Sequence, residues 1–467
     1  MLEERSTSRE LLVTLDDDAT GSLHVRLERR LREDVRAGRL RPGTALPSTR
    51  DLAQRLGVSR GVVVEAYAQL AAEGYLTARR GSGTRVASAM RAAEADGGGG
   101  LDRHVPRYSF HPGQPDVAAF PRDAWLASAR RALRDAGDRD LGYPHPSGAP
   151  LLREVLAEHL GRVRGVVADP RRVIVTSGLV QGAGLVFRAL RATGGRRVGL
   201  EDPGWPGHRA PAEHAGLEVV PIPVDADGAR VEVLEDSDVD AVVVTPAHQA
   251  PMGTVLAPER RAALLAWAEA RDAIVFEDDY DAEYRYDREP VGALQGLAPD
   301  RVVYAGSTSK VLAPALRLAW LVVPPRLRRA VAHEKAIADL GTPVLEQLTL
   351  ADFIATGALD RHVRRMRRRY GERRDAFVDL MHRHLPEAEV AGVAAGLNAV
   401  VWLPDGTDEN AVVTAAWARG LEVHGLAPGR IDPAGARPAL VLGYAALAEP
   451  ALEPAIVELA AAYRAAA

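Results

Sequence analysis

The sequence predicts an α/β protein in which a small basic helical module, residues 1–87, precedes a large body of alternating strands and helices. Three observations support this prediction. The chain has 467 residues, more than a single hydrophobic core usually organises. Residues 22–87 hold 13 Arg against 6 Asp plus Glu, a charge of +7. Since the net charge of the chain is −4, the remaining residues carry −11. Between the two parts lies Gly97–Gly100, a run typical of a flexible linker, which we place at residues 88–108.

The composition is that of an ordinary globular protein, with 47% hydrophobic and 26% charged residues. The chain has no cysteine, which excludes disulfides, thiolate catalysis and cysteine-ligated metal and fits a reducing cytoplasm. We expect no metal site. The start of the chain lacks a signal-peptide pattern, and no apolar run approaches membrane-spanning length. The sequence therefore predicts a cytoplasmic protein that does not associate with membranes.

The amino-terminal module has the pattern of a winged helix-turn-helix. A first helix is predicted over Ser22–Ala37, with apolar residues at four-residue spacing. A second helix starts near Ser48, which is spaced from Asp51 as in a capping box, and ends at Gly57. Ser59 is expected to cap a third helix that runs to about Glu73, and residues 75–86 resemble a β-hairpin with arginines and glycines at its tip. The apolar positions of the first helix are Leu23, Leu27, Leu31 and Val35; those of the third are Val63, Ala66, Tyr67 and Leu70.

The exposed positions of this module suit DNA. Arg60 can contact a phosphate or a guanine edge, and Gly61 removes a side chain where the third helix would approach the groove. Arg79 and Arg80, on the wing, can enter the minor groove or touch phosphates. The alternative is a three-helix protein-interaction domain with a solvated charged face. Helix order, cap, turn and wing together favour DNA binding.

Two motifs in this module resemble those of the GntR family of bacterial regulators. They are Leu-Pro-Ser-x-Arg-x-Leu-Ala, at residues 46–53, and Val-Ser-Arg, at residues 58–60. The resemblance covers about 65 residues and implies contacts with a double-stranded DNA operator. The residues implied are Arg50, Ser59, Arg60, Gly61 and the wing residues Arg79, Arg80 and Gly81.

From residue 109 to 324 strand-like runs alternate with helical stretches. This alternation predicts a mainly parallel sheet covered by helices on both faces, with ligands bound beyond the carboxyl ends of its strands. The strand-like runs are 173–175, 198–200, 217–220, 241–244, 273–276, 302–304 and 318–323, and helical stretches include 151–160, 181–190 and 258–270.

Lys310 lies on a loop between two of these strands and is the candidate reactive group. A lysine on such a loop can be desolvated, which lowers its pKa and frees the amine to attack a carbonyl. Only Lys310 and Lys335 are lysines among 59 basic residues, so arginine serves almost wherever a positive charge suffices. Guanidinium cannot form a Schiff base, and a retained lysine here indicates amine chemistry. The alternative is a solvated loop lysine.

Further candidate groups follow strands that end at the same sheet edge. Ser307, Ser309 and Arg317 suit the phosphate of a cofactor, and residues 176–181 follow a strand and open a helix, so that backbone N–H groups can hold phosphate. In the run 277–280, which follows another strand, a carboxylate can pair with a pyridine nitrogen and a phenol can bond a ring hydroxyl. An acidic run after a strand is usually only solvated, but three such sites at one edge are stronger evidence.

Several motifs resemble fold-type I, pyridoxal-phosphate-dependent aminotransferases. They lie at residues 110–121, 201–205, 245–253, 277–280 and 307–310. With the amino-terminal module, the chain is similar to MocR-type regulators, a GntR branch that joins a winged helix to an aminotransferase-like domain. The resemblance covers roughly residues 22–467. It implies a large pyridoxal-phosphate-binding domain at residues 109–324 and a small carboxyl-terminal α/β domain at residues 325–467.

The resemblance also implies roles for individual residues. Lys310 would form the Schiff base with pyridoxal 5′-phosphate, Asp278 would contact the pyridine nitrogen and Tyr280 the ring hydroxyl. Trp205 would stack on the ring, with a core aromatic as the alternative, and Tyr143 would reach the phosphate of a neighbouring subunit. The residues expected at the phosphate are Arg317, Ser307, Ser309, Gly178, Leu179 and Val180.

One departure from the family pattern lies in the small domain. Aminotransferases usually carry an arginine in the strand predicted at residues 439–444, where it clamps the substrate carboxylate; the matching position here is Val441. Losing a charge-assisted contact of about 1.5–3 kcal/mol weakens binding by about one to two orders of magnitude. Ala250 also stands where an asparagine is common. Arg437 or Arg430 could substitute for the missing arginine, although both lie in a predicted loop.

The chain retains the residues expected to bind the cofactor but lacks the arginine that would bind a substrate carboxylate. This combination favours a sensor of pyridoxal phosphate over an enzyme. The chain resembles the PdxR subgroup of MocR-type regulators, which implies control of vitamin B6 synthesis genes in response to pyridoxal phosphate. Two alternatives stay open: a regulator that responds to an amino acid, and a working aminotransferase with an appended DNA-binding module. Because fold-type I sites are usually built from two subunits, the resemblance implies a head-to-tail homodimer.

Overall fold

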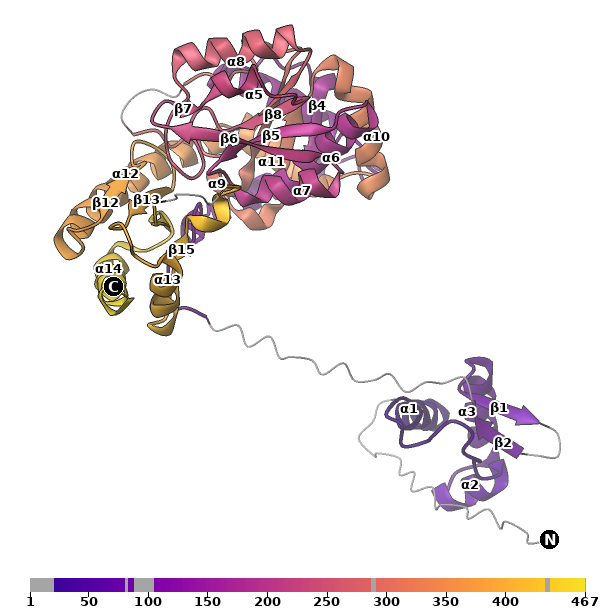
Figure 1. Cartoon of the computed structure of the whole chain (residues 1–467). Coiled ribbons are helices and arrows are strands. Elements are labelled where there is room, and N and C mark those ends of the chain that lie inside the picture. Colours follow the sequence, from indigo (N-terminus) through magenta and orange to yellow (C-terminus); the bar gives the residue numbers. More distant parts are fainter. Residues whose placement is uncertain (1–20, 80–82, 88–104, 287–290, 433–436, 467) are drawn as a thin grey trace. The chain divides into compact units, whose positions relative to one another are not determined.

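The computed structural model describes residues 21–79, 83–87, 105–286, 291–432 and 437–466, and these form two compact units on either side of residues 88–104. Most of the predicted linker lies outside the described residues. The elements of the first unit are α1 (Leu23–Arg36), α2 (Thr49–Leu56), α3 (Arg60–Ala72), β1 (Leu76–Arg79) and β2 (Gly83–Val86). This order confirms the predicted winged helix (Figure 1).

The three helices and the hairpin of the first unit share one core. Leu27 and Leu31 of α1 are fully buried against Val63 and Leu70 of α3, as the apolar spacing predicts. Leu23 continues the apolar spacing of α1 but is 42% exposed, so the buried part of this face begins at Leu27.

The ends of α2 and α3 differ in how they are capped. Ser48 accepts a hydrogen bond from the Asp51 N–H at 3.2 Å, which confirms it as the cap of α2, and Gly57 ends that helix in the left-handed region at φ +67°. Ser59 precedes α3 but its side chain makes no capping bond, so that part of the prediction is wrong and its hydroxyl is available to a ligand. Strands β1 and β2 pair antiparallel from Leu76 opposite Val86, which confirms the hairpin.

The second unit is built on an eight-stranded sheet in the order β4-β11-β10-β9-β8-β5-β6-β7. Neighbours among β10, β9, β8, β5 and β6 run parallel, whereas β11 is antiparallel to both β10 and β4, and β7 to β6. The mainly parallel sheet is therefore confirmed. Its strands are β4 (Val173–Thr176), β5 (Arg197–Asp202), β6 (Glu218–Asp225), β7 (Gly228–Ala229), β8 (Ala241–Val244), β9 (Ile274–Asp278), β10 (Val302–Ser307) and β11 (Ala319–Val322).

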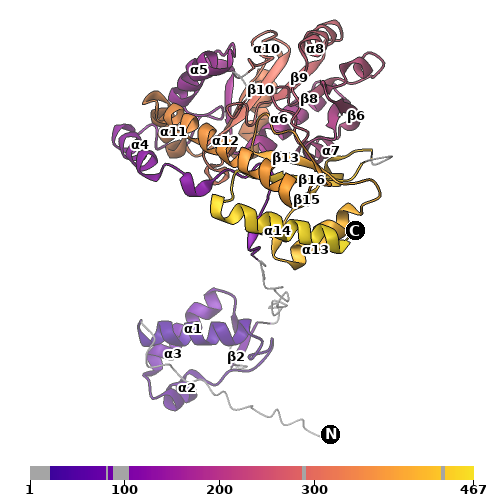
Figure 2. The same ribbon diagram turned by 90° about the vertical axis from the view of Figure 1, so that its left-hand side faces the viewer.

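Helices cover both faces of this sheet, as Figures 1 and 2 show from two directions. Alternate residues of a strand face opposite sides: Ile174 packs into the core that α6, α7 and α10 cover, while Val173 and Val175 pack into the core that includes α5 and α11. The helices of this part are α4 (Arg122–Asp135), α5 (Pro150–Arg164), α6 (Leu179–Ala192), α7 (Arg209–His214), α8 (Pro258–Ala270), α9 (Thr308–Val311), α10 (Pro325–Asp339) and α11 (Val344–Ala355).

The carboxyl-terminal part adds a smaller antiparallel sheet in the order β12-β13-β16-β15 with three helices. The composition of residues 421–424 predicts a single strand, but the structure has two: β14 pairs with β3 near the start of the unit, and β15 pairs with β16. The two pieces are separated at the buried Val423, where the chain changes sheets. The elements are β3 (Tyr108–Ser109), β12 (Glu389–Ala391), β13 (Asn398–Trp402), β14 (Leu421–Glu422), β15 (His424–Gly425), β16 (Ala439–Gly443), α12 (Ala358–His384), α13 (Glu409–Ala418) and α14 (Glu449–Ala466).

Two packing facts bear on the domain division, which remains a proposal. Leu327 and Val331 of α10, placed by the sequence in the small domain, pack into the core beneath the large sheet. Tyr108, at the predicted end of the linker, already belongs to β3. Among the described residues no helix is long and apolar enough to cross a membrane.

Candidate functional site

A cavity of about 440 Å³ lies at the carboxyl ends of β4, β9 and β10, and residues of the small domain close its other side. Nine of the predicted cofactor residues line it. They are Lys310, Asp278, Tyr280, Arg317, Ser307, Ser309, Trp205, Leu179 and Val180. Strands that are parallel end at one edge, so segments distant in sequence meet there.

Lys310 lies on the short helix α9, directly after β10. The N–H of Thr308 and its hydroxyl both donate to the carbonyl of Leu318, at 2.9 and 3.0 Å, which anchors the start of that turn. Burial lowers the pKa of Lys310 despite the carboxylates of Asp281 and Asp278 nearby. A Cβ added at Gly113 would lie 2.8 Å from Nζ of Lys310, so the glycine lets the backbone approach the amine closely. These contacts exclude a solvated loop lysine.

Asp278 ends β9 and is 4% exposed. One carboxylate oxygen, Oδ2, lies 3.1 Å from Nε2 of His208, while the other, Oδ1, is buried without a hydrogen-bond partner among the described residues. Burial raises the pKa of Asp278, an effect that the histidine opposes. A buried acceptor without a partner costs free energy unless a ligand supplies a donor, and a protonated pyridine nitrogen is such a donor.

Tyr280 places its hydroxyl 3.0 Å from Nδ1 of His248, which in turn lies 3.0 Å from the carboxylate of Asp281. Burial raises the pKa of Tyr280 well above its ordinary value, and neighbouring carboxylates act in the same direction. The side chain therefore stays a neutral phenol that can donate a hydrogen bond. Burial opposes charge on His248, but the contact with Asp281 outweighs it and raises the pKa of that histidine.

Asp279 and Glu277, in the same acidic run, form hydrogen bonds within the protein and do not face the cavity. Arg164 donates to both oxygens of Asp279, at 2.7 and 3.0 Å, and Tyr304 donates at 2.7 Å. Glu277 accepts backbone N–H bonds from Leu294 and residue 295. Only residues 278 and 280 of the run line the cavity, as the alternation of side chains along a strand requires.

Arg317 faces the amino terminus of α6. Its guanidinium lies so close to Gly178 that a Cβ there would come 2.4 Å from Nη2, and Gly178 has φ +119°. The backbone N–H of Arg317 donates to the carbonyl of Pro314 at 3.3 Å, but its guanidinium has no hydrogen bond or ion pair with any described residue. Leu179 and Val180 begin the 14-residue α6, whose first backbone N–H groups and positive dipole end favour an anion.

The two predicted aromatic residues Trp205 and Tyr143 differ in position. Trp205 is 40% exposed and lines the cavity with its ring edge-on to His208, 4.9 Å between centroids, which excludes a core aromatic. Tyr143 does not line the cavity of its own chain and is 93% exposed. The contact of Tyr143 with the phosphate of a neighbouring subunit is therefore a proposal.

The residues present fit pyridoxal phosphate. The cavity offers a desolvated amine, a buried carboxylate oxygen without a partner, a neutral phenol and an uncommitted guanidinium at a helix terminus. When bound, the cofactor would supply an aldehyde and an electron-withdrawing ring.

The wall that would face an amino-acid substrate includes Asn398 and His424 but no described arginine. Val441 lines the cavity, and Arg317 is the one arginine among its described lining residues. Arg437 instead pairs with Glu389 at 2.9 Å and covers the ring of Trp402, and Arg430 donates to the carbonyl of Arg437. The two arginines considered as substitutes for the clamp are therefore engaged elsewhere.

Sequence reasoning missed several cavity residues. Gly113 lies in the motif at residues 110–121, but its place in that motif does not predict its approach to Lys310, and nothing in the sequence marks His208 as the partner of Asp278. His111 and His424 also line the cavity, and with Glu422 they bring possible metal ligand atoms within 4.8 Å of one another. Nε2 of His424 lies 3.3 Å from Oε1 of Glu422. This direct contact between the two side chains explains why they lie close together without an ion between them.

Four of the DNA-binding candidates lie on the surface of the first unit. Arg50, Ser59, Arg60 and Gly61 are exposed near the amino-terminal ends of α2 and α3. The Nε of Arg60 lies 3.4 Å from the Thr49 hydroxyl, which links the two helices. Arg79 is the last residue of β1, whereas Arg80 and Gly81 lie outside the described residues.

This architecture defines a class: a winged helix of regulatory type joined to a fold-type I aminotransferase-like domain. Residues 23–86 match the family "Bacterial regulatory proteins, gntR family", and residues 113–434 match "Aminotransferase class I and II". Kynurenine aminotransferase of Pyrococcus horikoshii has 27% identity and a TM-score of 0.70 over 76% of this chain and 90% of its own. An archaeal alanine:glyoxylate aminotransferase has 27% identity and a TM-score of 0.71 over 77% and 91%.

Relatives that match both parts are regulators. The chain is 38% identical over 424 residues to the "HTH-type pyridoxine biosynthesis transcriptional regulator PdxR" of Corynebacterium glutamicum, covering 89% of this chain and 91% of the relative. It is 39% identical over 399 residues to the "Probable rhizopine catabolism regulatory protein MocR" of Rhizobium meliloti, covering 80% of each. The chain belongs to the MocR-type regulators of the GntR family.

Proposed function

We propose that this regulator senses pyridoxal 5′-phosphate, bound at Lys310, and controls genes of vitamin B6 synthesis through its winged helix. The observation that carries the proposal is the asymmetry of the cavity. Lys310, Asp278 and Arg317 offer an amine, a carboxylate and a guanidinium to the cofactor, while Val441 offers no charge to a substrate carboxylate. Similarity to the pyridoxine biosynthesis regulator of C. glutamicum supports the choice of target genes.

The chain's own groups support covalent capture of an aldehyde. The neutral amine of Lys310 can condense with an aldehyde carbon and release one water. A lowered pKa increases the fraction of neutral amine at neutral pH. Asp278 and Tyr280 would orient the ring, and Arg317, Ser307, Ser309 with the first turn of α6 would hold the phosphate.

A gel-shift titration tests the sensor. Operator DNA is titrated with the full-length protein with and without pyridoxal phosphate, for wild type and Lys310→Ala. We expect the vitamer to change the operator affinity of wild type and to leave that of the variant unchanged. The same affinity in all four conditions would refute the sensor role.

The competing functions are outcomes of the same design. If an amino acid shifts the operator affinity of the cofactor-loaded protein while pyridoxal phosphate alone does not, the effector is the amino acid. Repeated turnover of an amino acid with a keto-acid acceptor would indicate a working aminotransferase, which the retained Lys310, Asp278 and Tyr280 would support.

We propose a head-to-tail homodimer in which Tyr143 completes the partner's site. The exposed Tyr143 lies in an apolar neighbourhood: Leu141 is 60% and Leu340 61% exposed, and Gly341 packs on Pro144. Exposed apolar surface of this kind favours a protein partner. Mixing Tyr143→Phe with Lys310→Ala chains tests the arrangement, because each mixed dimer would regain one intact site. High-affinity binding that does not return on mixing would contradict it.

A further inference from the structure

The second of the chain's two lysines, Lys335, is fully buried on α10 and does not line the cavity. Its ammonium lies 2.6 and 2.7 Å from the carboxylate oxygens of Asp339 and 3.0 Å from the hydroxyl of Thr342. These contacts use all three N–H donors. A guanidinium, with five donors and a larger volume, would leave donors unpaired here, which gives a physical reason for lysine in an arginine-rich chain.

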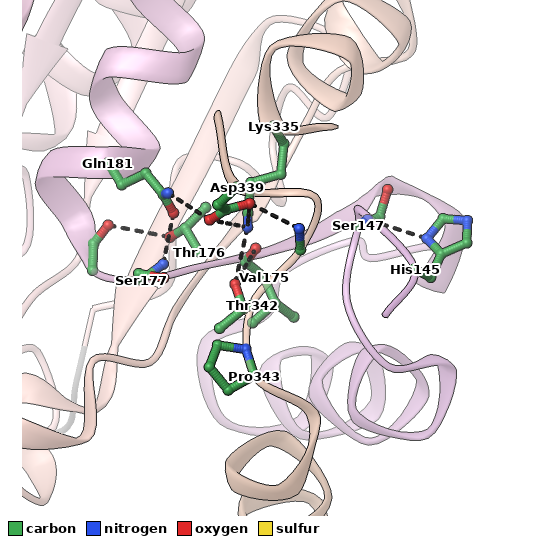
Figure 3. Close-up of polar contacts among 12 residues, drawn as sticks. His145, Ser147, Val175, Thr176, Ser177, Gln181, Lys335, Asp339, Thr342 and Pro343 are labelled. Carbon is green, nitrogen blue, oxygen red and sulfur yellow. Dashed lines mark hydrogen bonds and ion pairs between the residues drawn. The ribbon is translucent and has the colours of Figure 1, made fainter. Parts of the chain in front are cut away.

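The network continues from Lys335 and Asp339 to Gln181 and Ser177, as Figure 3 shows. The amide of Gln181 donates to Oδ2 of Asp339 at 2.8 Å, and its carbonyl accepts the backbone N–H of Ser177 at 2.7 Å. Ser177 directly precedes Gly178, the residue against which the Arg317 guanidinium lies. The buried ion pair is therefore two hydrogen bonds away from the turn that opens α6.

The other end of the network reaches the segment that carries Tyr143. Asp339 also accepts the N–H of Gly341 at 2.9 Å. A Cβ at Gly341 would lie 2.8 Å from Cγ of Pro144, so this turn packs directly on the residue after Tyr143. One buried cation thus ties the phosphate turn and the proposed subunit-contact segment to α10.

We infer that Lys335 is a positioning residue for the cofactor phosphate, acting through Asp339 and Gln181 on the turn Ser177–Val180. The inference rests on the proposed function, since it assumes that pyridoxal phosphate occupies the cavity. Backbone N–H groups hold an anion only when their directions are set. The Gln181 side-chain carbonyl fixes the Thr176–Ser177 peptide, the one that leads into this turn. Without the ammonium of Lys335, the carboxylate of Asp339 loses its fixed position, and so does the Gln181 amide that donates to it. The hydrogen bond from Ser177 to Gln181 then no longer holds this turn in place.

Comparison of pyridoxal phosphate with pyridoxal isolates this role, because the two aldehydes differ only in the phosphate. Binding of each to the full-length protein is measured from the absorbance of the covalent adduct at Lys310. For Lys335→Met we expect the dissociation constant of pyridoxal phosphate to rise by about tenfold, which corresponds to the loss of one charge-assisted hydrogen bond. The ratio of the pyridoxal constant to the pyridoxal phosphate constant should therefore fall by about tenfold. Pyridoxal affinity should be nearly unchanged.

Two further variants separate positioning from general stability. Gln181→Leu leaves the buried ion pair intact and should lower the same ratio, and the double variant with Lys335→Met should add little. Arg373→Met removes another buried cation, paired with Asp116 at 2.9 Å outside the cavity, and should lower the melting temperature without changing the ratio.

The outcomes are distinct. If Lys335→Met and Gln181→Leu weaken both aldehydes equally, or change neither, the positioning role is overturned while cofactor binding stands. If Lys335→Met does not fold, Gln181→Leu decides alone. If wild type forms no adduct with pyridoxal phosphate, the proposed function fails and this inference fails with it.

Discussion

The replacement Asp278→Asn gives the sharpest test of the cofactor site, because it should act in opposite directions on ligand binding and on stability. In the folded chain Oδ1 is buried without a partner among the described residues, and burial raises the pKa of the carboxyl. The amide removes a charge whose burial is unfavourable. We therefore expect the melting temperature of the cofactor-free protein to stay constant or to rise.

Affinity for pyridoxal phosphate should fall in the same variant. A hydrogen bond between a carboxylate and a protonated ring nitrogen contributes about 1.5–3 kcal/mol, which corresponds to a factor of about ten to 150 in the dissociation constant. Absorbance titration measures this factor, and a thermal scan without ligand measures the stability.

A ring analogue with C–H in place of the pyridine nitrogen provides the control. Asp278→Asn should not weaken binding of the analogue, since no ring donor is lost. Asp281→Asn is the matched variant: this buried carboxylate pairs with His248, so its loss should destabilise the fold without discriminating between the two ligands. Equal losses for cofactor and analogue in Asp278→Asn would refute the assignment.

Three other predictions concern separate parts of the chain. Arg317→Met should weaken pyridoxal phosphate by about tenfold or more and leave pyridoxal nearly unchanged, as measured by adduct absorbance. Arg60→Ala should weaken operator binding in a gel shift; if Arg60 contacts a phosphate, the slope of log affinity against log salt falls by about one. Burial and Arg365 lower the pKa of His362 to about 4 from 6.5 in the unfolded chain, so this histidine stabilises the fold above pH 6.5 and the contribution is lost as pH falls towards 4. Denaturant unfolding should show about 2 kcal/mol of loss over that window in wild type and a flatter profile in His362→Gln.

Much of the cofactor-facing site could be predicted because parallel strands end at one edge. Lys310, Asp278 and Gly178 lie at or just beyond the carboxyl ends of different strands, and local patterning was enough to place those strands. His208 could not be found in this way. Its pairing with Asp278 depends on how the loop after β5 folds over the sheet, and no spacing along the chain encodes that contact.

Local errors have a similar origin. The run 421–424 has the composition of one strand, but its two halves pair with different partners, one of them more than 300 residues away in the sequence. Leu23 fits the apolar spacing of α1, but its side chain is 42% exposed, unlike the fully buried Leu27 and Leu31. Periodicity reports which face is apolar; it does not report how far the partner surface extends.

By itself the sequence determined the two-part organisation, the order of the elements and the residue types that can react, because backbone propensity and side-chain chemistry are local properties. The tertiary structure alone decided which of these groups share a cavity, that Val441 lines it in place of an arginine, and that Lys335 connects through Asp339 and Gln181 to Ser177. Such facts depend on contacts between segments far apart in the chain, whose distances are set only when the core packs.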